Sequence, residues 1–303
     1  MLLVWWDGDL EPVTSVQNKL QEMDYNVVKL GTLKKSHEEW KMQLKRLVIE
    51  HTPIFILIWN RHTNIKAVRD VYSGRIKLFN WDDPWSVMND ELSNVDCIDD
   101  VYSCCLDTKE YYLSKGAKTW TYLTPFYNPI IHYPDFDARY RCDVSFVCTN
   151  LYTDLPINKV DRSELMLALS REKDIVFHVY GPDSISFLCP ENYRGPILYT
   201  ENRKIFTSSK VNISLHITKG RGYINERCVT ILASGGLLLM DTNEGVDELL
   251  PDSFVTMRDT IPEIVAQIKE LINTDTSCVT QNGLKSVQKL SVDNWVSTIL
   301  QRA

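Results

Sequence analysis

The 303-residue sequence lacks the features that would assign it to several common classes. No apolar run approaches the roughly 20 residues that a membrane-spanning helix needs, and the N-terminus lacks the basic start of a signal peptide. The eight cysteines form no Cys-x-x-Cys pair and have no histidine at zinc-ligand spacing. We therefore expect no transmembrane segment, reduced and mostly buried cysteines, no bound metal and a cytoplasmic protein.

Two nucleotide-binding motifs are also missing. No Gly-x-Gly-x-x-Gly follows the first apolar run, which disfavours a Rossmann oxidoreductase, and the P-loop motif does not occur. A net charge of −7 without a basic stretch argues against nucleic-acid binding. What is present is the composition of a soluble globular protein, long enough for two domains that each bury a core.

Short apolar runs alternate with segments of helical periodicity, which predicts two doubly wound parallel sheets with a cleft between the two halves. Residues 125–137 hold three prolines and no helical period, so we predict a linker there. The predicted strands are residues 1–6, 26–30, 53–59, 76–80, 101–106, 120–123, 143–148, 175–180, 211–217, 237–240 and 254–256. The predicted helices are 12–23, 36–50, 65–72, 108–115, 162–173, 200–208, 225–233, 261–272 and 292–301.

The most informative segment is 219–250. Gly220 and Gly222 bound a loop, a helix is predicted to begin near Asn225, and an apolar run at 237–240 predicts a strand covered on both faces. Ligands bind at the carboxyl ends of strands in open α/β sheets. A helix N-terminus beside Arg227 suits an anion such as a diphosphate.

These residues resemble the glycosyltransferases of the GT-B fold, specifically the spore-maturation (CgeB-like) group. In the first half the resemblance rests on the sequence Asn-Trp-Asp-Asp-Pro-Trp at 80–85, on 111–116, and on 122–125 with 128–129. In the second half it rests on 143–147, 179–182, 222–227, 233–235 and 245–249.

The resemblance implies two Rossmann-like domains facing each other across a cleft. Residues 1–134 would bind the acceptor, and residues 135–303 would bind a nucleotide sugar, with the last helix, 292–301, packing back on the N-terminal domain. It also implies metal-independent transfer of a sugar, most often from a UDP-sugar, to a hydroxyl of a glycan, protein or small molecule. No cofactor beyond this co-substrate is expected.

The candidate site residues divide into three groups. For catalysis we select Arg227 to stabilise the leaving diphosphate, Glu226 to hold sugar hydroxyls, and Asp7 as a general base. The donor would contact Asn150, Tyr180, Gly181, Lys219, Arg221, Gly222, Tyr223, Ile224, Asn225, Thr230 and Glu248. The acceptor would contact Trp6, Asp82 and Asp83.

Each candidate also has an ordinary structural explanation. Arg227 suits a surface ion pair, Glu226 a helix cap, and Asp7 a tight turn, while the two loop glycines suit a turn without a ligand. The histidines at 132, 178 and 216 are interpreted as packing or strand-face residues.

The sequence departs from the family pattern at two places. Cys148 stands where many relatives have glycine, and the Glu-x7-Glu pair of retaining relatives falls at Gly222 and Thr230. A nucleotide-sugar epimerase or phosphorylase on the same fold, or a binding protein without catalysis, therefore stays open as an alternative.

Overall fold

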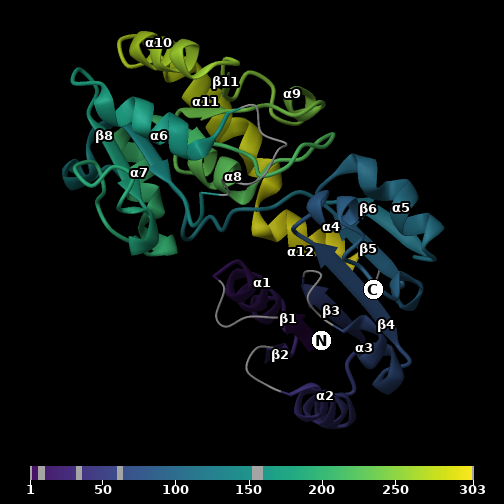
Figure 1. The fold of residues 1–303 in the computed structure, drawn as a ribbon. Helices are drawn as coiled ribbons and strands as arrows, with labels where there is room; N and C mark the ends of the chain where they lie inside the picture. The colour runs from purple at the N-terminus through teal and green to yellow at the C-terminus, as the bar shows by residue number, and fades with distance from the viewer. Residues whose placement is uncertain (1, 6–10, 32–35, 60–63, 152–159, 302–303) are drawn as a thin grey trace. The chain divides into compact units, whose positions relative to one another are not determined.

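The computed structural model describes residues 2–5, 11–31, 36–59, 64–151 and 160–301. The chain divides into two compact units, whose helices and strands are labelled in Figure 1. Unit 1 contains residues 1–125, 220–223 and 292–303, and unit 2 contains residues 126–219 and 224–291. Each unit is therefore assembled from more than one stretch of sequence.

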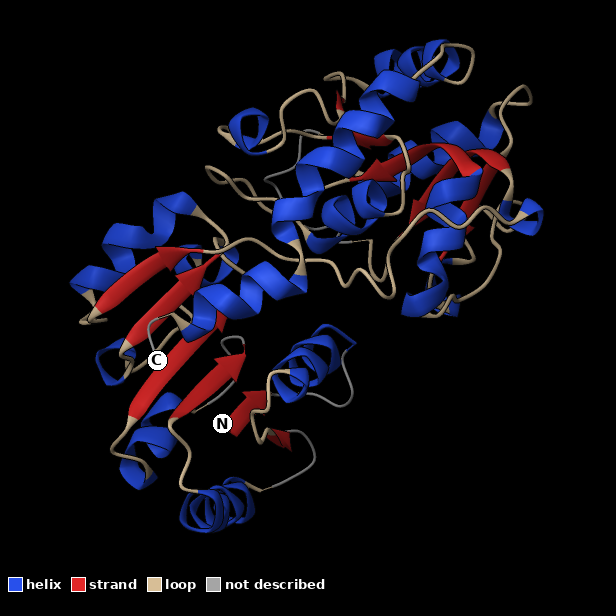
Figure 2. Ribbon diagram, turned by 180° about the vertical axis from the view of Figure 1, so that it is seen from behind, coloured by secondary structure: helices blue, strands red, loops and turns tan. Residues whose placement is uncertain are grey.

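Unit 1 has a six-stranded parallel sheet in the order β2-β1-β3-β4-β5-β6. Figure 2 shows its strands running in the same direction. The strands are β1 (Leu2–Trp5), β2 (Val28–Gly31), β3 (Phe55–Trp59), β4 (Arg75–Asn80), β5 (Asp100–Ser103) and β6 (Thr119–Tyr122). The helices are α1 (Glu11–Glu22), α2 (His37–His51), α3 (Ile65–Val71), α4 (Trp85–Met88), α5 (Lys109–Ser114) and α12 (Val292–Leu300).

Unit 2 has a five-stranded parallel sheet in the order β11-β10-β9-β7-β8. The strands are β7 (Cys142–Val147), β8 (Phe177–Tyr180), β9 (Ser209–Ser214), β10 (Leu238–Met240) and β11 (Val255–Thr256). The helices are α6 (Arg162–Arg171), α7 (Asn202–Ser208), α8 (Glu226–Ala233), α9 (Val246–Leu249), α10 (Ile261–Leu271) and α11 (Ser277–Ser286).

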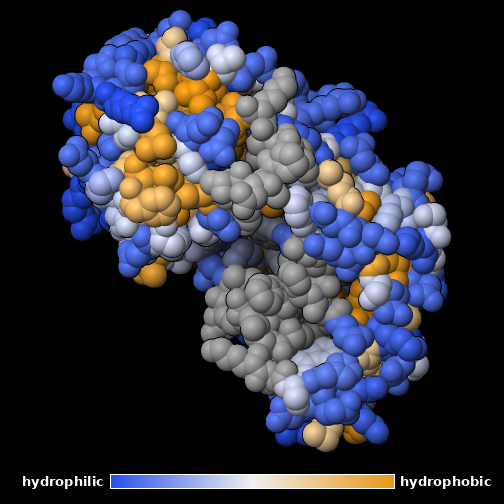
Figure 3. Space-filling view, viewed as in Figure 1, coloured by the Kyte–Doolittle hydropathy of each residue, from blue (hydrophilic) through white to orange (hydrophobic). Residues whose placement is uncertain are grey.

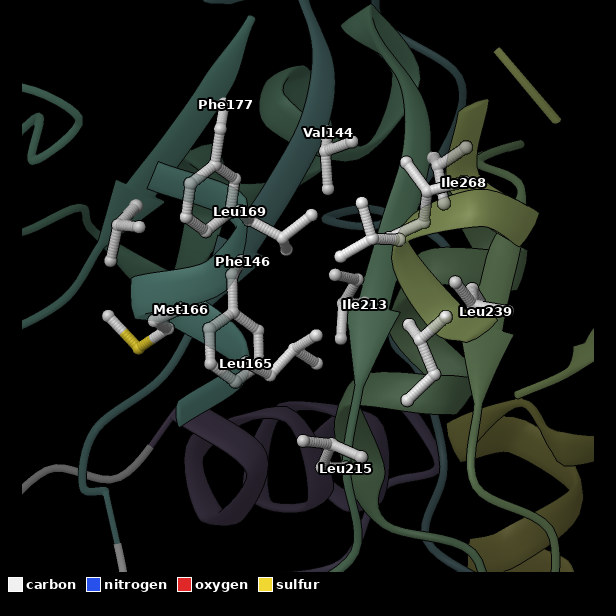
Figure 4. Packing of buried hydrophobic residues seen from close by; sticks show 14 of the residues in the cluster. Val144, Phe146, Leu165, Met166, Leu169, Phe177, Ile213, Leu215, Leu239 and Ile268 are labelled. Atoms are coloured by element: carbon white, nitrogen blue, oxygen red, sulfur yellow. The ribbon is translucent and has the colours of Figure 1, made fainter. Parts of the chain in front are cut away.

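Burial on both faces explains why the central strands are so apolar. Every residue of β3 is buried, as expected for a parallel strand covered by helices on both sides. In unit 2, Phe146 and Phe177 lie on the neighbouring strands β7 and β8 and belong to one core with Leu165 and Leu169 of α6, as Figure 4 shows. A second core on unit 2 includes α7 and α8 residues.

The structure confirms the predicted doubly wound architecture and the existence of each predicted strand and helix within the described residues. Sequence analysis missed α4 and α11. The polar sequence of α11 gives little apolar periodicity, and the helix packs against α8, where a Cβ at Gly283 would lie 2.9 Å from a Leu232 side-chain carbon. Close packing, rather than local propensity, supports this helix.

The surface and the cysteines agree with the composition. Hydrophilic residues predominate on the face in Figure 3, and hydrophobic ones form separate patches. None of the helices in the described part of the chain is both long and apolar enough to cross a membrane. All eight cysteines are free thiols, and six of them are buried, as predicted.

A buried lysine fastens the last helix to the sheet of unit 1. The Lys77 side chain on β4 is fully buried, and its Nζ donates a hydrogen bond to the backbone carbonyl of Ile299, in the last turn of α12. The ammonium also lies 4.5 Å from the centre of the Phe55 ring. A cation is favourable at a helix C-terminus, where the carbonyl groups are left without intrahelical partners.

We predict that Lys77→Ala lowers the free energy of unfolding by about 2–4 kcal/mol, because it opens a cavity and removes the donor to a buried carbonyl. Lys77→Met fills the space and should lose less. Lys66→Ala, which removes an exposed lysine paired with Asp70, is the control and should leave stability unchanged. Urea unfolding of the three variants measures this; equal stability of Lys77→Ala and the wild type would contradict it.

Candidate functional site

The strand order of unit 2 defines where a ligand is expected. From β7 the chain continues to β8 on one side and then to β9 on the other side, so the order reverses between β7 and β9. Such a point leaves a crevice at the carboxyl ends of the strands, because the following loops diverge. A ligand is therefore expected beside the residues that follow β7 and β9 and beside the start of α8.

Asn225 ties the start of α8 to the end of β9. Its Oδ1 accepts from the backbone N–H of Cys228 at 3.1 Å and from the hydroxyl of Ser214 at 3.1 Å. Its Nδ2 donates to the carbonyl of Leu215 at 3.4 Å. The predicted helix start is therefore confirmed, and the cap fixes the direction of the first-turn N–H groups.

Two arginines lie near the end of β7. Burial raises the pKa of the Cys148 thiol, and the nearby charges of Arg227 and Arg162 oppose that shift. The Arg227 guanidinium has no hydrogen-bond or ion-pair partner among the described residues. Arg162 is 4 % exposed and donates to the carbonyls of Asn150 and Leu215. Guanidinium groups at a switch point suit a phosphate ligand.

The carboxylate of Asp241, which follows β10, is hydrogen-bonded to residues that follow β9. Asp241 Oδ1 accepts from the backbone N–H of His216 at 2.8 Å and from its ring Nδ1 at 2.9 Å, and Oδ2 accepts from Lys219 Nζ at 2.6 Å. Burial opposes the His216 charge, but Asp241 and Cys228 raise its pKa to about 9. Burial likewise disfavours the Asp241 carboxylate, yet His216 and Lys219 lower its pKa to about 2.

Lys219 and Asp241 border a cavity of about 170 Å³ at the carboxyl ends of β9, β10 and β11. Lys219 and Asp241 line it together with Thr242, Thr256 and Arg258. His216 is fully buried and does not line the cavity. Lys219 and Asp241 could therefore contact a ligand in the cavity, whereas His216 contacts Asp241 from the protein interior.

Glu226, the first residue of α8, is held by Tyr199. The Tyr199 hydroxyl donates to Glu226 Oε1. Burial raises the pKa of the Glu226 carboxyl, while Tyr199 and the charge of Arg227 oppose the shift. The Tyr199 ring also lies edge-on to buried His132, whose burial lowers its pKa to about 3. His132 is therefore a neutral packing residue, in agreement with its interpretation from the sequence.

Tyr180 and Gly181 end β8 beside Cys148. Tyr180 is 3 % exposed, and its hydroxyl lies 3.5 Å from His178 Nδ1. A Cβ at Gly181 would lie 2.2 Å from the carbonyl oxygen of Cys148. Glycine is thus required here by the close approach of two strand ends.

The glycine loop 220–223 belongs to unit 1, which the sequence did not indicate. The backbone N–H of Arg221 donates to Asp107 at 2.7 Å, and its carbonyl accepts from Leu106 N at 2.9 Å. The Tyr122 hydroxyl donates to the Gly222 carbonyl at 2.7 Å. Tyr223 packs with Cys104 and Cys105. The geometry explains both glycines by packing, since a Cβ at either would contact unit 1 at 3.0 Å or closer.

The two predicted acceptor carboxylates have different environments. Asp82 is partly exposed, just after β4. Asp83 is fully buried and accepts from Asn80 Nδ2 at 2.7 Å, Ser103 Oγ at 2.6 Å and the Tyr112 hydroxyl at 2.8 Å. Asp83 therefore holds the loop that follows β4 in its conformation.

The remaining candidates are dispersed. Thr230 is 3 % exposed, and its hydroxyl donates to the carbonyl of Arg227 at 3.1 Å. Ile224 is fully buried, and Glu248 is exposed on α9. Trp6 and Asp7 lie outside the described residues. Within the described ranges, no group of three or more His, Cys, Asp or Glu could hold a metal.

Sequence reasoning did not select Asp241, Tyr199 or His216. His216 was interpreted as a core or strand-face residue, and it is buried, but its ring is bonded to a carboxylate. The available signal was an acid directly after an apolar strand, at Asp241, because strand ends meet at one edge of a parallel sheet.

Comparison with known proteins agrees with this geometry. Residues 162–300 match a family model described as glycosyl transferase-like. Sucrose-phosphate synthase from Thermosynechococcus elongatus has a TM-score of 0.72 at 10 % identity, covering 100 % of this chain and 98 % of that one. An E. coli structure described as trehalose-6-phosphate bound with UDP-2-fluoro glucose has a TM-score of 0.70 at 9 % identity, with coverages of 100 % and 98 %.

The chain has the GT-B fold, and its residues 162–300 match the glycosyl transferase-like family model. A third similar structure, from Listeria monocytogenes, is named as a candidate UDP-N-acetylglucosamine 2-epimerase. It has a TM-score of 0.61 at 10 % identity and covers 99 % of this chain and 94 % of that one. No curated protein sequence matches this chain significantly. At these identities the solved structures establish the fold alone.

We predict that Gly220→Ala lowers the free energy of unfolding of the protein by about 1–3 kcal/mol, because the new methyl group overpacks the loop. That Cβ would lie 2.5 Å from Cys105 Sγ and 2.9 Å from Pro84 Cγ. Gly31→Ala is the control, since a Cβ there meets nothing within 4 Å. Thermal and urea unfolding measure both. Equal free energies of unfolding for Gly220→Ala and Gly31→Ala would disprove the packing explanation.

Proposed function

We propose that this glycosyltransferase moves a sugar from a nucleotide-diphosphate sugar, a UDP-sugar in the first instance, to a hydroxyl group of a glycan, protein or small molecule. The observation that carries the proposal is the set of cations around the start of α8 and the ends of β7 and β9: Arg162, His216, Lys219 and Arg227. Asp241 is the one acid bonded to this set by the contacts described above. A diphosphate is the kind of anion that several cations beside a helix N-terminus attract.

The transfer requires charge stabilisation at the leaving group. The bond between the anomeric carbon and the β-phosphate oxygen breaks, and its electron pair stays with the diphosphate. Arg227 and the first-turn N–H groups of α8 stabilise that charge. The acceptor oxygen forms the new bond to the anomeric carbon and gives up its proton to a base, for which we propose Asp7. In this scheme the diphosphate is held without a metal ion.

The roles of the other candidates follow from their surroundings. Glu226 has a raised pKa and a bond from Tyr199, so it is suited to hold sugar hydroxyls beside the diphosphate. Lys219 faces the cavity at the strand ends, where it supports the binding of the donor. Tyr180 and Gly181, at the end of β8, are proposed to border the nucleoside.

Unit 1 is proposed to bind the acceptor. Asp82 is the partly exposed carboxylate at the end of β4, so it is a better candidate for a contact to acceptor hydroxyls than buried Asp83. Trp6 is retained as an acceptor contact on the resemblance to the CgeB-like group. That resemblance also supports glycan biosynthesis in the cytoplasm as the setting.

An epimerase or phosphorylase remains the rival function, because one similar structure is named as a candidate epimerase. An epimerase releases or rearranges the sugar without an acceptor, and a phosphorylase needs inorganic phosphate. Incubation of the protein with each UDP-sugar, with and without an acceptor mixture or phosphate, separates these classes. Acceptor-dependent release of UDP supports transfer, and equal release without an acceptor opposes it.

We predict that a UDP-sugar raises the melting temperature of the wild type, whereas NAD and ATP do not, because a ligand that binds the folded state stabilises it. Arg227→Ala should lose the shift, since an arginine–phosphate contact is worth roughly 10- to 100-fold in affinity.

The matched control for this screen is Arg171→Ala. Arg171 is exposed in the last turn of α6, at the opposite end of that helix from Arg162. Its variant should keep the full thermal shift. If no nucleotide sugar shifts the wild type, the donor proposal is wrong; if Arg227→Ala keeps the shift, Arg227 lies outside the donor site.

A further inference from the structure

A buried ion pair lies directly behind the start of α8. The His216 ring is 0 % exposed, with Nδ1 bonded to Asp241 Oδ1 at 2.9 Å and Nε2 at 3.8 Å from Cys228 Sγ. Cys228 is the third residue of α8, and its backbone N–H is held by the helix cap Asn225. His216 therefore contacts the first turn of the helix from the protein interior.

Within the described part of the chain, the charged and titratable groups near this ring come from several elements. Asp241 follows β10, Lys219 follows β9 in the same loop as His216, and Cys228 belongs to α8. Arg162 reaches the adjacent Leu215 carbonyl from α6. Because Asp241 also binds Lys219, one carboxylate serves two cations.

The Asp241 carboxylate compensates the imidazolium only in part, because it also binds Lys219. The N-terminus of a helix carries a partial positive charge of about half an elementary charge, so an imidazolium beside it is repelled. Burial adds to the cost of the charge. An anion bound at the first turn of α8 would relieve both effects, and the attraction would be strong because the interior screens charge weakly.

We propose that His216 is a positioning residue of the donor site. Its ring holds a positive charge in a fixed place beside the first turn of α8, and this charge strengthens the binding of the donor's diphosphate without direct contact. This inference rests on the proposed function. It adds a residue that acts through the helix start, with Asp241 holding the ring in place.

The charge of His216 gives the proposal a definite pH dependence. The pKa of His216 is raised to about 9, so the ring is positive at pH 7.5 and becomes neutral as the pH rises through 9. A terminal phosphate with a pKa near 6 is already fully ionised in this range. UDP affinity should therefore fall between about pH 8 and pH 10.

Thermodynamic linkage between UDP binding and protonation of His216 gives a second measurable quantity, the uptake of protons. If a bound diphosphate favours the charged ring, the ring must favour the bound diphosphate equally. UDP binding at pH 9 should then be accompanied by proton uptake. Calorimetry in two buffers of different ionisation enthalpy measures that uptake directly, and a residue that only packed the core would not produce it.

Titration of the protein with UDP tests this proposal. His216→Gln should weaken UDP binding by about tenfold at pH 7.5, and it should abolish both the fall in affinity near pH 9 and the proton uptake. His178→Gln is the matched control. His178 is a half-buried histidine on β8 whose pKa is lowered by burial, so it is neutral over the whole range.

Two further variants test whether Cys228 or Lys219, rather than His216, causes the fall in UDP affinity. Cys228→Ser removes the thiol beside the ring, and Lys219→Arg keeps a positive charge that stays protonated throughout this pH range. If His216 is the source of the fall, Lys219→Arg should keep it near pH 9, and Cys228→Ser should move it to lower pH, because Cys228 contributes to the raised pKa of His216. Because the uracil ring of UDP also titrates in this pH range, the fall and the proton uptake are assigned to His216 by comparison with His216→Gln, or with His216→Asn if the first variant folds poorly.

The possible outcomes distinguish an error in the proposed donor from an error in the proposed role of His216. If the wild type binds neither UDP nor any UDP-sugar, the proposed donor is wrong. If the wild type binds UDP with no fall between pH 8 and pH 10 and no proton uptake, the donor proposal stands and the role of His216 is overturned. The same holds if His216→Gln binds UDP as tightly as the wild type does.

Discussion

The bond between Asp241 and His216 is the interaction on which the proposed donor site of unit 2 depends. A parallel sheet brings the ends of neighbouring strands to one edge, and this carboxylate joins the ends of β9 and β10 there. It accepts from the backbone as well as from the ring, so it fixes the chain and the imidazole together. Asn225 then joins the start of α8 to the end of β9 by hydrogen bonds to Ser214 and Leu215. The strand ends that carry the cations and the start of the helix are therefore held together.

Most of the fold could be predicted from the sequence because its signals are local. Apolar runs of strand length, such as β3, and periodic segments, such as α2 with its Ser36–Glu39 capping box, specify elements without knowledge of their partners. The α11 helix could not be predicted in this way. Its sequence is polar, and its support comes from close contact between Gly283 and Leu232, which only the folded chain brings together.

The candidate site was predictable only in part. The helix start at Asn225 follows from capping chemistry, and Arg227 follows from its position near that start. The pairing of His216 with Asp241 joins residues 25 positions apart, and no local pattern encodes it. The loop glycines illustrate the opposite problem. Their sequence suits a phosphate loop, yet their surroundings, Cys105 for Gly220 and Tyr122 for Gly222, account for them by packing.

The assignment of residues 220–223 to unit 1 has a consequence for engineering. The chain passes from one unit to the other at four places: after residues 125, 219, 223 and 291. A recombinant fragment spanning 126–291 would therefore carry a four-residue insert whose packing partners are missing. In it, Tyr223, which is 5 % exposed in the intact chain, would be stripped of Cys104 and Cys105 and turned toward solvent. Chimeras that exchange donor specificity between homologues would need to graft this tetrapeptide with its host scaffold, not with the nucleotide-binding half.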